Sequence, residues 1–229
     1  MIPYIAGNQL TLLQNSTEYI PALEAAIDRA SSHIYLESYI YADDATGQRI
    51  STALMRAVQR GVATHLIIDG YGAQDYPASA LQALRAAGVD ALIYRAQISP
   101  WRFRRQRLRR LHRKLAVIDQ TVAFVGGINI VNDADSPGTP PQFDFAVAVQ
   151  GPLVAPILQE MRKLHAHMLR IRLRLPDTAT VPPAPLPVGK MRAAFIQRTN
   201  LKHRRDIERA YLRAIGKAHH EIILANSYF

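Results

Sequence analysis

The chain has 229 residues and no cysteine, and its 28 Lys and Arg residues outnumber the 18 Asp and Glu residues, giving a formal net charge of +10. This length supports one hydrophobic core or slightly more, and the 48% apolar content is typical of a globular protein rather than a disordered one. The composition excludes disulfides and thiol chemistry, and the sequence predicts neither a transmembrane helix nor a secretory signal. The charge favours polyanionic partners: nucleic acid, anionic lipid surfaces or phosphorylated substrates.

The first half of the chain alternates segments typical of strands with segments typical of helices. Short apolar runs predict strands over residues 10–14, 33–40, 64–70 and 89–94. Apolar residues three or four apart predict a helix from about Pro21 with a cap at Ser16 or Thr17, a helix over 48–60, and a third around Leu81 and Leu84 that ends at Gly88. This alternation predicts an α/β domain with a mainly parallel or mixed sheet.

The second half continues this pattern and then starts again after a proline-rich segment. Strands are predicted over residues 111–118, 122–125 and 143–150, and a helix over residues 153–170. Residues 176–189 contain five prolines, which is typical of a semi-rigid linker. Beyond them, the chain repeats the strand, helix and strand order of its first forty residues. We therefore expect a lobe over 1–175, a linker over 176–189 and the beginning of a second, truncated lobe over 190–229.

One stretch, RLHRKLAVIDQTVAFVGGIN over residues 110–129, combines residue types suited to chemistry on phosphorus. Residues two apart in a strand share a face, so His112 and Lys114 are predicted to point the same way. A neutral imidazole can attack a phosphorus atom, while an ammonium and the amide of Asn129 can stabilise charge on the non-bridging oxygens. The glycine pair before Asn129 allows the backbone to approach a ligand closely.

The spacing H-x-K-x4-D-x6-G-G-x-N resembles the motif of the phospholipase D superfamily, with all its fixed positions present. The segments IYLESYIYADDATGQ, LIIDGYG, FVGGINI and FDFAVAVQGP are similar to those of bacterial cardiolipin synthases, specifically the type without N-terminal transmembrane helices. The resemblance implies a phospholipase D-like αβα lobe with a mixed β-sheet flanked by helices. It further implies a phosphatidyltransferase that acts on phosphatidylglycerol through a covalent phosphatidyl-histidine.

The resemblance also implies roles for individual residues, none of which requires a metal or another cofactor. It makes His112 the nucleophile, Lys114 and Asn129 the phosphate binders, Gly127 part of the phosphate site in place of a serine common in the superfamily, Asp119 a mainly structural aspartate, and Asp144 the acid that bonds the far nitrogen of His112. Such a bond would fix the tautomer and stabilise the imidazolium, as an aspartate does in a Ser-His-Asp triad.

The chain departs from the family pattern because it contains one copy of the motif, whereas family enzymes pair two. One histidine attacks and the other protonates the leaving alcohol, so the second must come from a missing second lobe or from a homodimer. The alternatives are therefore a homodimeric phosphodiesterase or nuclease, or an inactive lipid-binding fragment.

The basic run over residues 101–114 holds seven arginines and one lysine, and it suits either an anionic membrane or nucleic acid. Trp101 and Phe103 are suited to interfacial anchoring, which favours the membrane. We expect a peripheral protein at the cytoplasmic face of the bacterial inner membrane, with phosphatidylglycerol and cardiolipin as lipid partners and nucleic acid as the less favoured partner.

Other polar clusters are predicted to be structural. His165 and His167 face different ways on a helix and are interpreted as surface residues rather than a metal pair. The pair Asp43-Asp44 is interpreted as a turn leading to a helix N-terminus. Glu37 matches a family position, with a structural role at least as well supported as a functional one.

Overall fold

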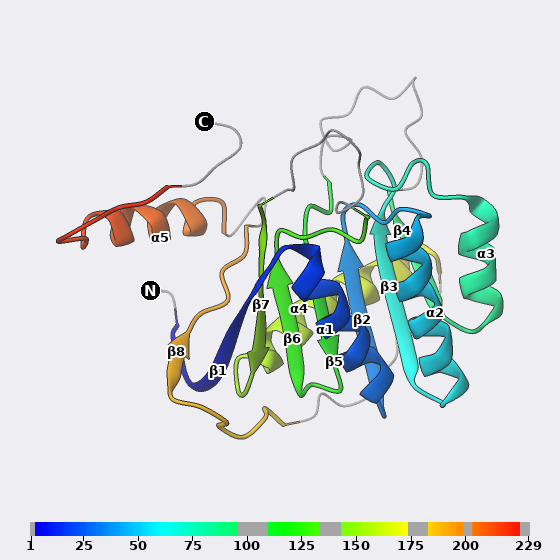
Figure 1. Ribbon diagram of the computed structural model, residues 1–229, viewed down its shortest axis with the longest axis horizontal. Coiled ribbons are helices and arrows are strands. Elements are labelled where there is room, and N and C mark those ends of the chain that lie inside the picture. Colours follow the sequence, from blue (N-terminus) through cyan, green and yellow to red (C-terminus); the bar gives the residue numbers. More distant parts are fainter. Residues whose placement is uncertain (1–2, 96–109, 133–142, 174–182, 199–202, 225–229) are drawn as a thin grey trace.

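The computed structural model describes residues 3–95, 110–132, 143–173, 183–198 and 203–224. Eight strands form one mixed sheet in the order β4-β3-β2-β5-β6-β7-β1-β8 (Figure 1). In chain order the strands are β1 (Ile5–Gln14), β2 (His33–Ser38), β3 (Ala63–Asp69), β4 (Asp90–Tyr94), β5 (Leu115–Ile118), β6 (Val122–Gly126), β7 (Phe145–Gln150) and β8 (Met191–Ala193). Strands β2, β3 and β4 run parallel, and the other pairs are antiparallel. The predicted α/β class with a mixed sheet is confirmed.

Helices cover both faces of this sheet. They are α1 (Asn15–Arg29), α2 (Ala45–Gln59), α3 (Ala78–Ala86), α4 (Val154–Ile171) and α5 (Asp206–Ile215). Helices α1 and α2 lie on one face and α4 lies on the other (Figure 1). Of the helices described, none combines the length and apolar character needed to cross a membrane.

Two apolar cores hold the helices to the sheet. On the α1–α2 side, Leu23 and Ile50 are fully buried together with Leu66 of β3. On the α4 side, Ile157 and Leu158 are fully buried against strands β5, β6 and β7. Each such side chain contributes on the order of 1.5–3 kcal/mol to folding, so these cores fix the strand ends that carry the polar residues described below.

Several predicted boundaries are wrong: β1, for example, begins at Ile5 rather than at residue 10. Local hydrogen bonds explain two of the others. The first helix begins at Asn15 rather than near Pro21, which lies inside it, because the Glu18 carboxylate accepts the Gln14 amide at 2.8 Å and starts the helix earlier. The strand predicted from residue 111 begins only at Leu115, because the Leu111 amide donates to the Asp69 carboxylate instead of to a neighbouring strand.

The last part of the chain joins the first lobe's sheet and then leaves it. Strand β8 pairs with β1, so it forms an edge of the same sheet instead of a separate one. Helix α5 lies off the sheet and has no buried residue (Figure 1). The second strand of the predicted repeat, residues 222–229, is not formed over 222–224, and 225–229 lie outside the described residues.

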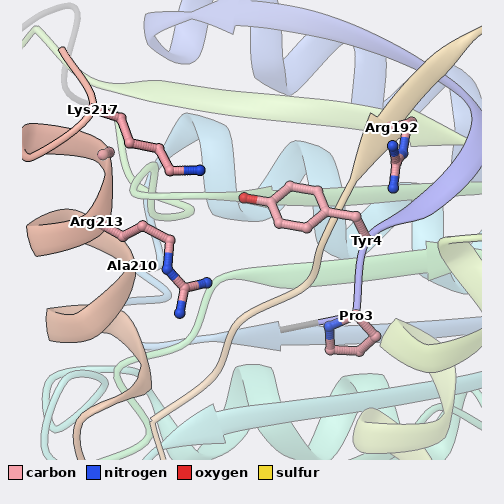
Figure 2. A pocket seen from close by; sticks show the side chains of 7 residues that line it. Pro3, Tyr4, Arg192, Ala210, Arg213 and Lys217 are labelled. Carbon is pink, nitrogen blue, oxygen red and sulfur yellow. The ribbon is translucent and has the colours of Figure 1, made fainter. Parts of the chain in front are cut away.

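Helix α5 borders a basic hollow of about 620 Å³, which is separate from the motif. Arg213 of α5 and Lys217, two residues beyond the end of that helix, face Tyr4 and Arg192 across this hollow (Figure 2). Three cations around one cavity attract anions.

Candidate active site

The residues of the predicted motif, except for Asp119, lie at one end of the sheet. Because β5 is antiparallel to β2 and β6, the entrance to β5 lies beside the exits of those two strands. Because β7 is antiparallel to β6, the first residue of β7 lies at this same end of the sheet. Because β3 is parallel to β2, the last residue of β3 lies there too. The ends of β5, β6, β7 and β3 therefore deliver His112, Lys114, Asn129, Asp144 and Asp69 to one region.

His112 and Lys114 meet in this region, as predicted, although both precede the strand. The Nζ of Lys114 lies 3.3 Å from Nε2 of His112. The ring of Tyr39 lies against both groups, with its centroid 4.7 Å from that of the imidazole and 5.1 Å from Nζ. His112 is exposed, whereas Lys114 is only 7% exposed. The arrangement places an exposed imidazole beside a buried cation.

The surroundings favour the neutral form of His112. Partial burial and then the Lys114 ammonium lower the pKa of His112, while the charge of Asp69 opposes them. Burial also lowers the pKa of Lys114, and the nearby Asp144 carboxylate opposes that shift. A neutral imidazole retains the lone pair that a nucleophile needs, so this environment suits the role predicted for His112.

Replacing Lys114 by methionine is expected to raise the pKa of His112, because the neighbouring cation is removed while the side-chain volume is nearly kept. Titration of the His112 ring proton by NMR measures this shift without any substrate. Lys163→Met, which changes an exposed lysine of α4, is the matched control and should leave the His112 titration unchanged. An unaltered titration in Lys114→Met would show that burial alone sets this pKa.

Asn129 is held so that its amide nitrogen can act as the donor. Its Oδ1 accepts the backbone amide of Ile40 at 3.0 Å, just beyond β2, and this bond orients the side chain. The amide of Gly127 donates to the Phe145 carbonyl at 2.9 Å. The predicted place of Gly127 in the phosphate site stays a prediction, and its backbone amide is already paired with this carbonyl.

The side chain of Asp144 fills the space next to the Gly127 Cα. A Cβ at position 127 would lie 2.2 Å from Asp144 Oδ1, so a side chain there requires the carboxylate to move. That carboxylate accepts the Phe145 amide at 2.7 Å. In the described residues Asp144 does not bond His112, so the predicted contact is absent in this conformation. Asp144 instead acts on the site through its charge, which favours the protonated form of Lys114.

Alanine substitution at Gly126 and at Gly127 is expected to have different costs, because the added Cβ meets backbone atoms at position 126 and a side chain at position 127. At position 126 an added Cβ would meet the Ala146 Cα at 2.5 Å, within the β6–β7 pairing. We expect Gly126→Ala to cost about 3 kcal/mol, because backbone must move, and Gly127→Ala to cost only about 1 kcal/mol. Urea unfolding of both variants measures these losses, and equal losses would contradict the interpretation.

Asp119 lies at the other end of β5, a strand of four residues and hence roughly 13 Å long. Its carboxylate accepts five hydrogen bonds, from the amides of Ser31, Ser32 and His33 and from the two serine hydroxyls, at 2.7–3.0 Å. Both Asp119 and Gln120 have positive φ, at 50° and 55°, in the turn that joins β5 to β6. The residue therefore ties this turn to the α1–β2 connection and is remote from His112.

Near the motif, Asp69 and Arg113 were not singled out by the sequence, and Glu37 was interpreted there as at least as well suited to a structural role as to a functional one. Asp69 receives the Leu111 amide at 2.7 Å and so positions the segment leading to His112. Glu37 forms a buried ion pair with Arg113, with 2.8 Å between Oε2 and Nε. Burial raises the pKa of Glu37 to about 7, although Arg113 opposes this. The sequence feature that could have identified Glu37 and Asp69 is their position. Both lie at the C-terminal ends of adjacent parallel strands, where functional sites commonly form.

A cavity of about 670 Å³ opens beside the motif. The motif contributes Arg110, His112 and Lys114, and the segment after β8 contributes Phe195, Gln197 and Arg198. Its size is typical of ligand sites, and its cations suit an anionic substrate with a partly apolar body. Residues 101–109 of the basic run, including Trp101 and Phe103, lie outside the described residues.

Two of the structural interpretations can be checked. Asp44 caps α2 by accepting the Gly47 amide at 2.9 Å, as its predicted place at a helix N-terminus requires. His167 is exposed as predicted, but His165 is 4% exposed and lies against the sheet, so its interpretation as a surface residue is wrong. The reason is that α4 packs its whole inner face on β2 and β5, and position 165 falls on that face.

Comparison with known proteins supports the resemblance. The family described as "Cardiolipin synthase, PLD-like domain" matches residues 23–169. A cardiolipin synthase B of Salmonella typhimurium is 39% identical over 226 residues, which cover 97% of this chain and 54% of that protein. The chain thus spans about half the length of the curated relatives it matches most extensively.

Solved structures share the fold. Phosphatidylserine synthase from Haemophilus influenzae matches 95% of this chain and 46% of its own, with a TM-score of 0.58 and 18% identity. The phospholipase D family member Nuc from Salmonella typhimurium matches 68% of this chain and 93% of its own, with a TM-score of 0.51 and 18% identity.

The match over residues 23–169 covers more than half of the chain and contains the whole motif from His112 to Asn129, together with Asp144. On this match, the chain belongs to the phospholipase D-like domain family of the cardiolipin synthases.

Proposed function

We propose that this chain provides the nucleophilic half of a cardiolipin synthase-like phosphatidyltransferase. The observation that carries the proposal is the 3.3 Å approach of His112 Nε2 to Lys114 Nζ at a basic cavity. Nε2 is the nitrogen next to the phosphate-binding cation, so we assign it as the attacking atom. Phosphatidylglycerol is the proposed donor, since the family is named for cardiolipin synthesis.

In the proposed reaction, Nε2 of His112 attacks the phosphorus of phosphatidylglycerol. The bond from phosphorus to the glycerol headgroup breaks, and glycerol leaves after it takes up a proton. Lys114 and Asn129 hold the non-bridging oxygens and stabilise the charge that develops on them. The headgroup hydroxyl of a second phosphatidylglycerol then attacks the phosphatidyl-histidine, loses its proton, and yields cardiolipin with His112 restored.

A second histidine is proposed to supply the proton to glycerol and to remove it from the acceptor. The sequence contains one motif, so this histidine is proposed to come either from the second lobe of a longer protein or from a second copy of this chain. Residues 190–224 are proposed to begin that second lobe, because Phe195, Gln197 and Ile207 already line the cavity beside the motif.

The protein is proposed to act as a peripheral protein at an anionic membrane surface. The cations around the motif cavity and those around the hollow beside α5, Arg192, Arg213 and Lys217, would contact lipid phosphates (Figure 2). Each basic residue near an anionic bilayer contributes about 1 kcal/mol to binding. Exposed apolar residues of α5, including Tyr211 and Leu212, are placed to contact the same surface or the second lobe.

The test is incubation of the purified chain with labelled phosphatidylglycerol in mixed micelles. Intact-mass analysis should detect a phosphatidyl adduct, and thin-layer separation should detect released glycerol or cardiolipin. A parallel incubation with single- and double-stranded DNA tests the alternative activity of a homodimeric phosphodiesterase, which the single motif and the positive charge favour. DNA cleavage without a lipid adduct would overturn the lipid assignment. If neither a lipid adduct nor DNA cleavage is detected, the chain would be restricted to lipid binding.

A further inference from the structure

A second polar cluster lies on the α4 side of the sheet, away from the motif. It consists of His65 on β3, Asp90 at the start of β4 and His165 on α4. Asp90 Oδ2 lies 2.6 Å from Nε2 of His165 and 3.5 Å from Nδ1 of His65. One potential ligand atom from each residue lies within 4.8 Å of the others. Three segments distant in the sequence thus place two imidazoles around one carboxylate.

The position of His65 points to a cation. Its Nδ1 is buried and has no hydrogen bond among the described residues. The Nδ1 of His65 lies 3.5 Å from the Asp90 oxygen, which is beyond the range of a good hydrogen bond. In the neutral tautomer whose proton is on Nε2, the lone pair of Nδ1 faces a lone pair of this oxygen, and the two repel each other. A buried polar atom without a partner is costly. A positive ion between nitrogen and oxygen would give the His65 nitrogen a partner.

Aromatic packing fixes both imidazoles. The ring of Tyr35 stacks on His65 with centroids 4.4 Å apart and meets His165 edge-on at 5.9 Å. The two imidazoles themselves lie 4.4 Å apart. Their side chains are 14% and 5% exposed, so the cluster is largely desolvated. The donors are therefore held in place, as ligands of a bound metal must be.

We propose that His65, Asp90 and His165 bind a divalent transition metal ion, with Zn²⁺ as the best match. Two imidazole nitrogens and one carboxylate oxygen are a common zinc donor set, with the fourth position left to water. Tetrahedral ligands about 2.0 Å from zinc lie about 3.3 Å from one another. The 3.5 Å separation of His65 from Asp90 already fits, and the 2.6 Å separation of His165 from Asp90 must open by less than 1 Å.

The site is structural because of its place in the fold. His65 precedes Asp69 by four residues on β3, so it lies roughly 13 Å along the strand from the end that carries the motif. A metal there joins α4 to β3 and β4. The same part of α4 packs Met168 and Leu169 against Ile67 and Leu111, next to the nucleophile. Metal binding would therefore stabilise the packing that supports the active site without entering the reaction.

The experiment is titration of the chelator-treated, untagged protein with Zn²⁺ in competition with a chromophoric chelator. We expect one equivalent to bind, and thermal unfolding to shift upward by about 5–10 °C at a hundredfold excess over the dissociation constant. Co²⁺ in place of Zn²⁺ should give visible absorption of a four- or five-coordinate ion with nitrogen and oxygen ligands.

Two variants test the ligands directly. His65→Phe keeps a ring for stacking on Tyr35 but removes the nitrogen, and Asp90→Asn keeps the shape of the side chain while removing its charge. Both are expected to weaken Zn²⁺ binding by ~100-fold or more. His167→Ala, an exposed histidine two residues further along α4, is the matched control and should bind as the wild type does.

A fourth variant distinguishes this site from the motif, whose exposed imidazole could also bind metal. His112→Ala is expected to retain the equivalent of Zn²⁺ and the cobalt absorption. Binding that is lost in His112→Ala, or unchanged in His65→Phe and Asp90→Asn, would overturn the proposal. A wild-type protein that binds no Zn²⁺ would also overturn it, and circular dichroism of each variant confirms that the losses occur in folded protein.

Discussion

Replacement of His112 by asparagine is expected to lower the rate of phosphatidyl transfer by at least ~10³-fold and to remove the covalent adduct completely. The imidazole is the proposed nucleophile, and asparagine has a similar reach but no nitrogen lone pair able to attack phosphorus. The adduct is measured by intact mass after incubation with labelled phosphatidylglycerol, and the rate by release of glycerol.

The loss of activity in His112→Asn should not arise from unfolding of the protein. His112 is exposed, and its described contacts are with Lys114 and Tyr39, so the substitution should change the free energy of unfolding by no more than about 0.5 kcal/mol. His167→Asn alters an exposed histidine outside the site and should leave both readouts unchanged. An adduct that persists in His112→Asn would require another nucleophile and would end the proposed assignment.

The pH dependence follows from the same geometry. The neutral imidazole is the reactive form, and burial together with Lys114 lowers the pKa of His112. The rate of adduct formation should therefore remain high below the ordinary histidine pKa of 6.5 and fall only when the pH passes through the lowered value. In Lys114→Met the fall should begin at a higher pH, in parallel with the titration of the ring proton.

The sequence predicted the α/β fold because periodicity reports which faces of each element are buried. Ile50, Leu54 and Val58 in α2 and the apolar run of β3 are local patterns, and the structure confirms both elements. Their exact ends depend on contacts that periodicity does not contain. Asp69 takes the Leu111 amide across 42 residues and thereby delays the start of β5.

The site was predictable to the extent that its residues are close in the chain. His112 and Lys114 are two apart, and their side chains meet even though the strand begins after them. Tyr39 joins them only because β2 and β5 are paired, which no local pattern reveals. His65, Asp90 and His165 likewise come together only through long-range contacts, because β3 pairs with β4 and α4 packs on the sheet.

The predicted contact of Asp144 with His112 shows a further limit. Residue type and position indicated an acid beside the nucleophile, and Asp144 does lie at the same end of the sheet. Its side chain, however, bonds the adjacent Phe145 amide, a choice between rotamers that depends on local geometry. The charge still reaches Lys114, so Asp144 supports the site electrostatically in this conformation.

Asp119→Asn is expected to lower the free energy of unfolding by about 2 kcal/mol at neutral pH. Partial burial alone would raise the pKa of Asp119, but hydrogen bonds from His33, Ser31 and Ser32 outweigh it and lower the pKa from 3.8 to about 2. A shift of this size corresponds to roughly 2 kcal/mol, after a discount for solvent screening of a carboxylate that is partly exposed. Urea unfolding at pH 7 measures the loss.

The backbone and the pH dependence separate the causes of that loss. Asparagine tolerates the positive φ of 50° at this position, whereas Asp119→Ala should lose about 1 kcal/mol more because alanine is strained there. Since the folded pKa is depressed, the contribution of the carboxylate is complete above pH 3.8 and disappears as the pH falls towards 2. The difference between wild type and Asp119→Asn should therefore shrink over that window, while exposed Asp75→Asn shows no comparable loss. A difference that stays constant from pH 5 to pH 2 would mean that shape, rather than charge, makes this aspartate important to the turn.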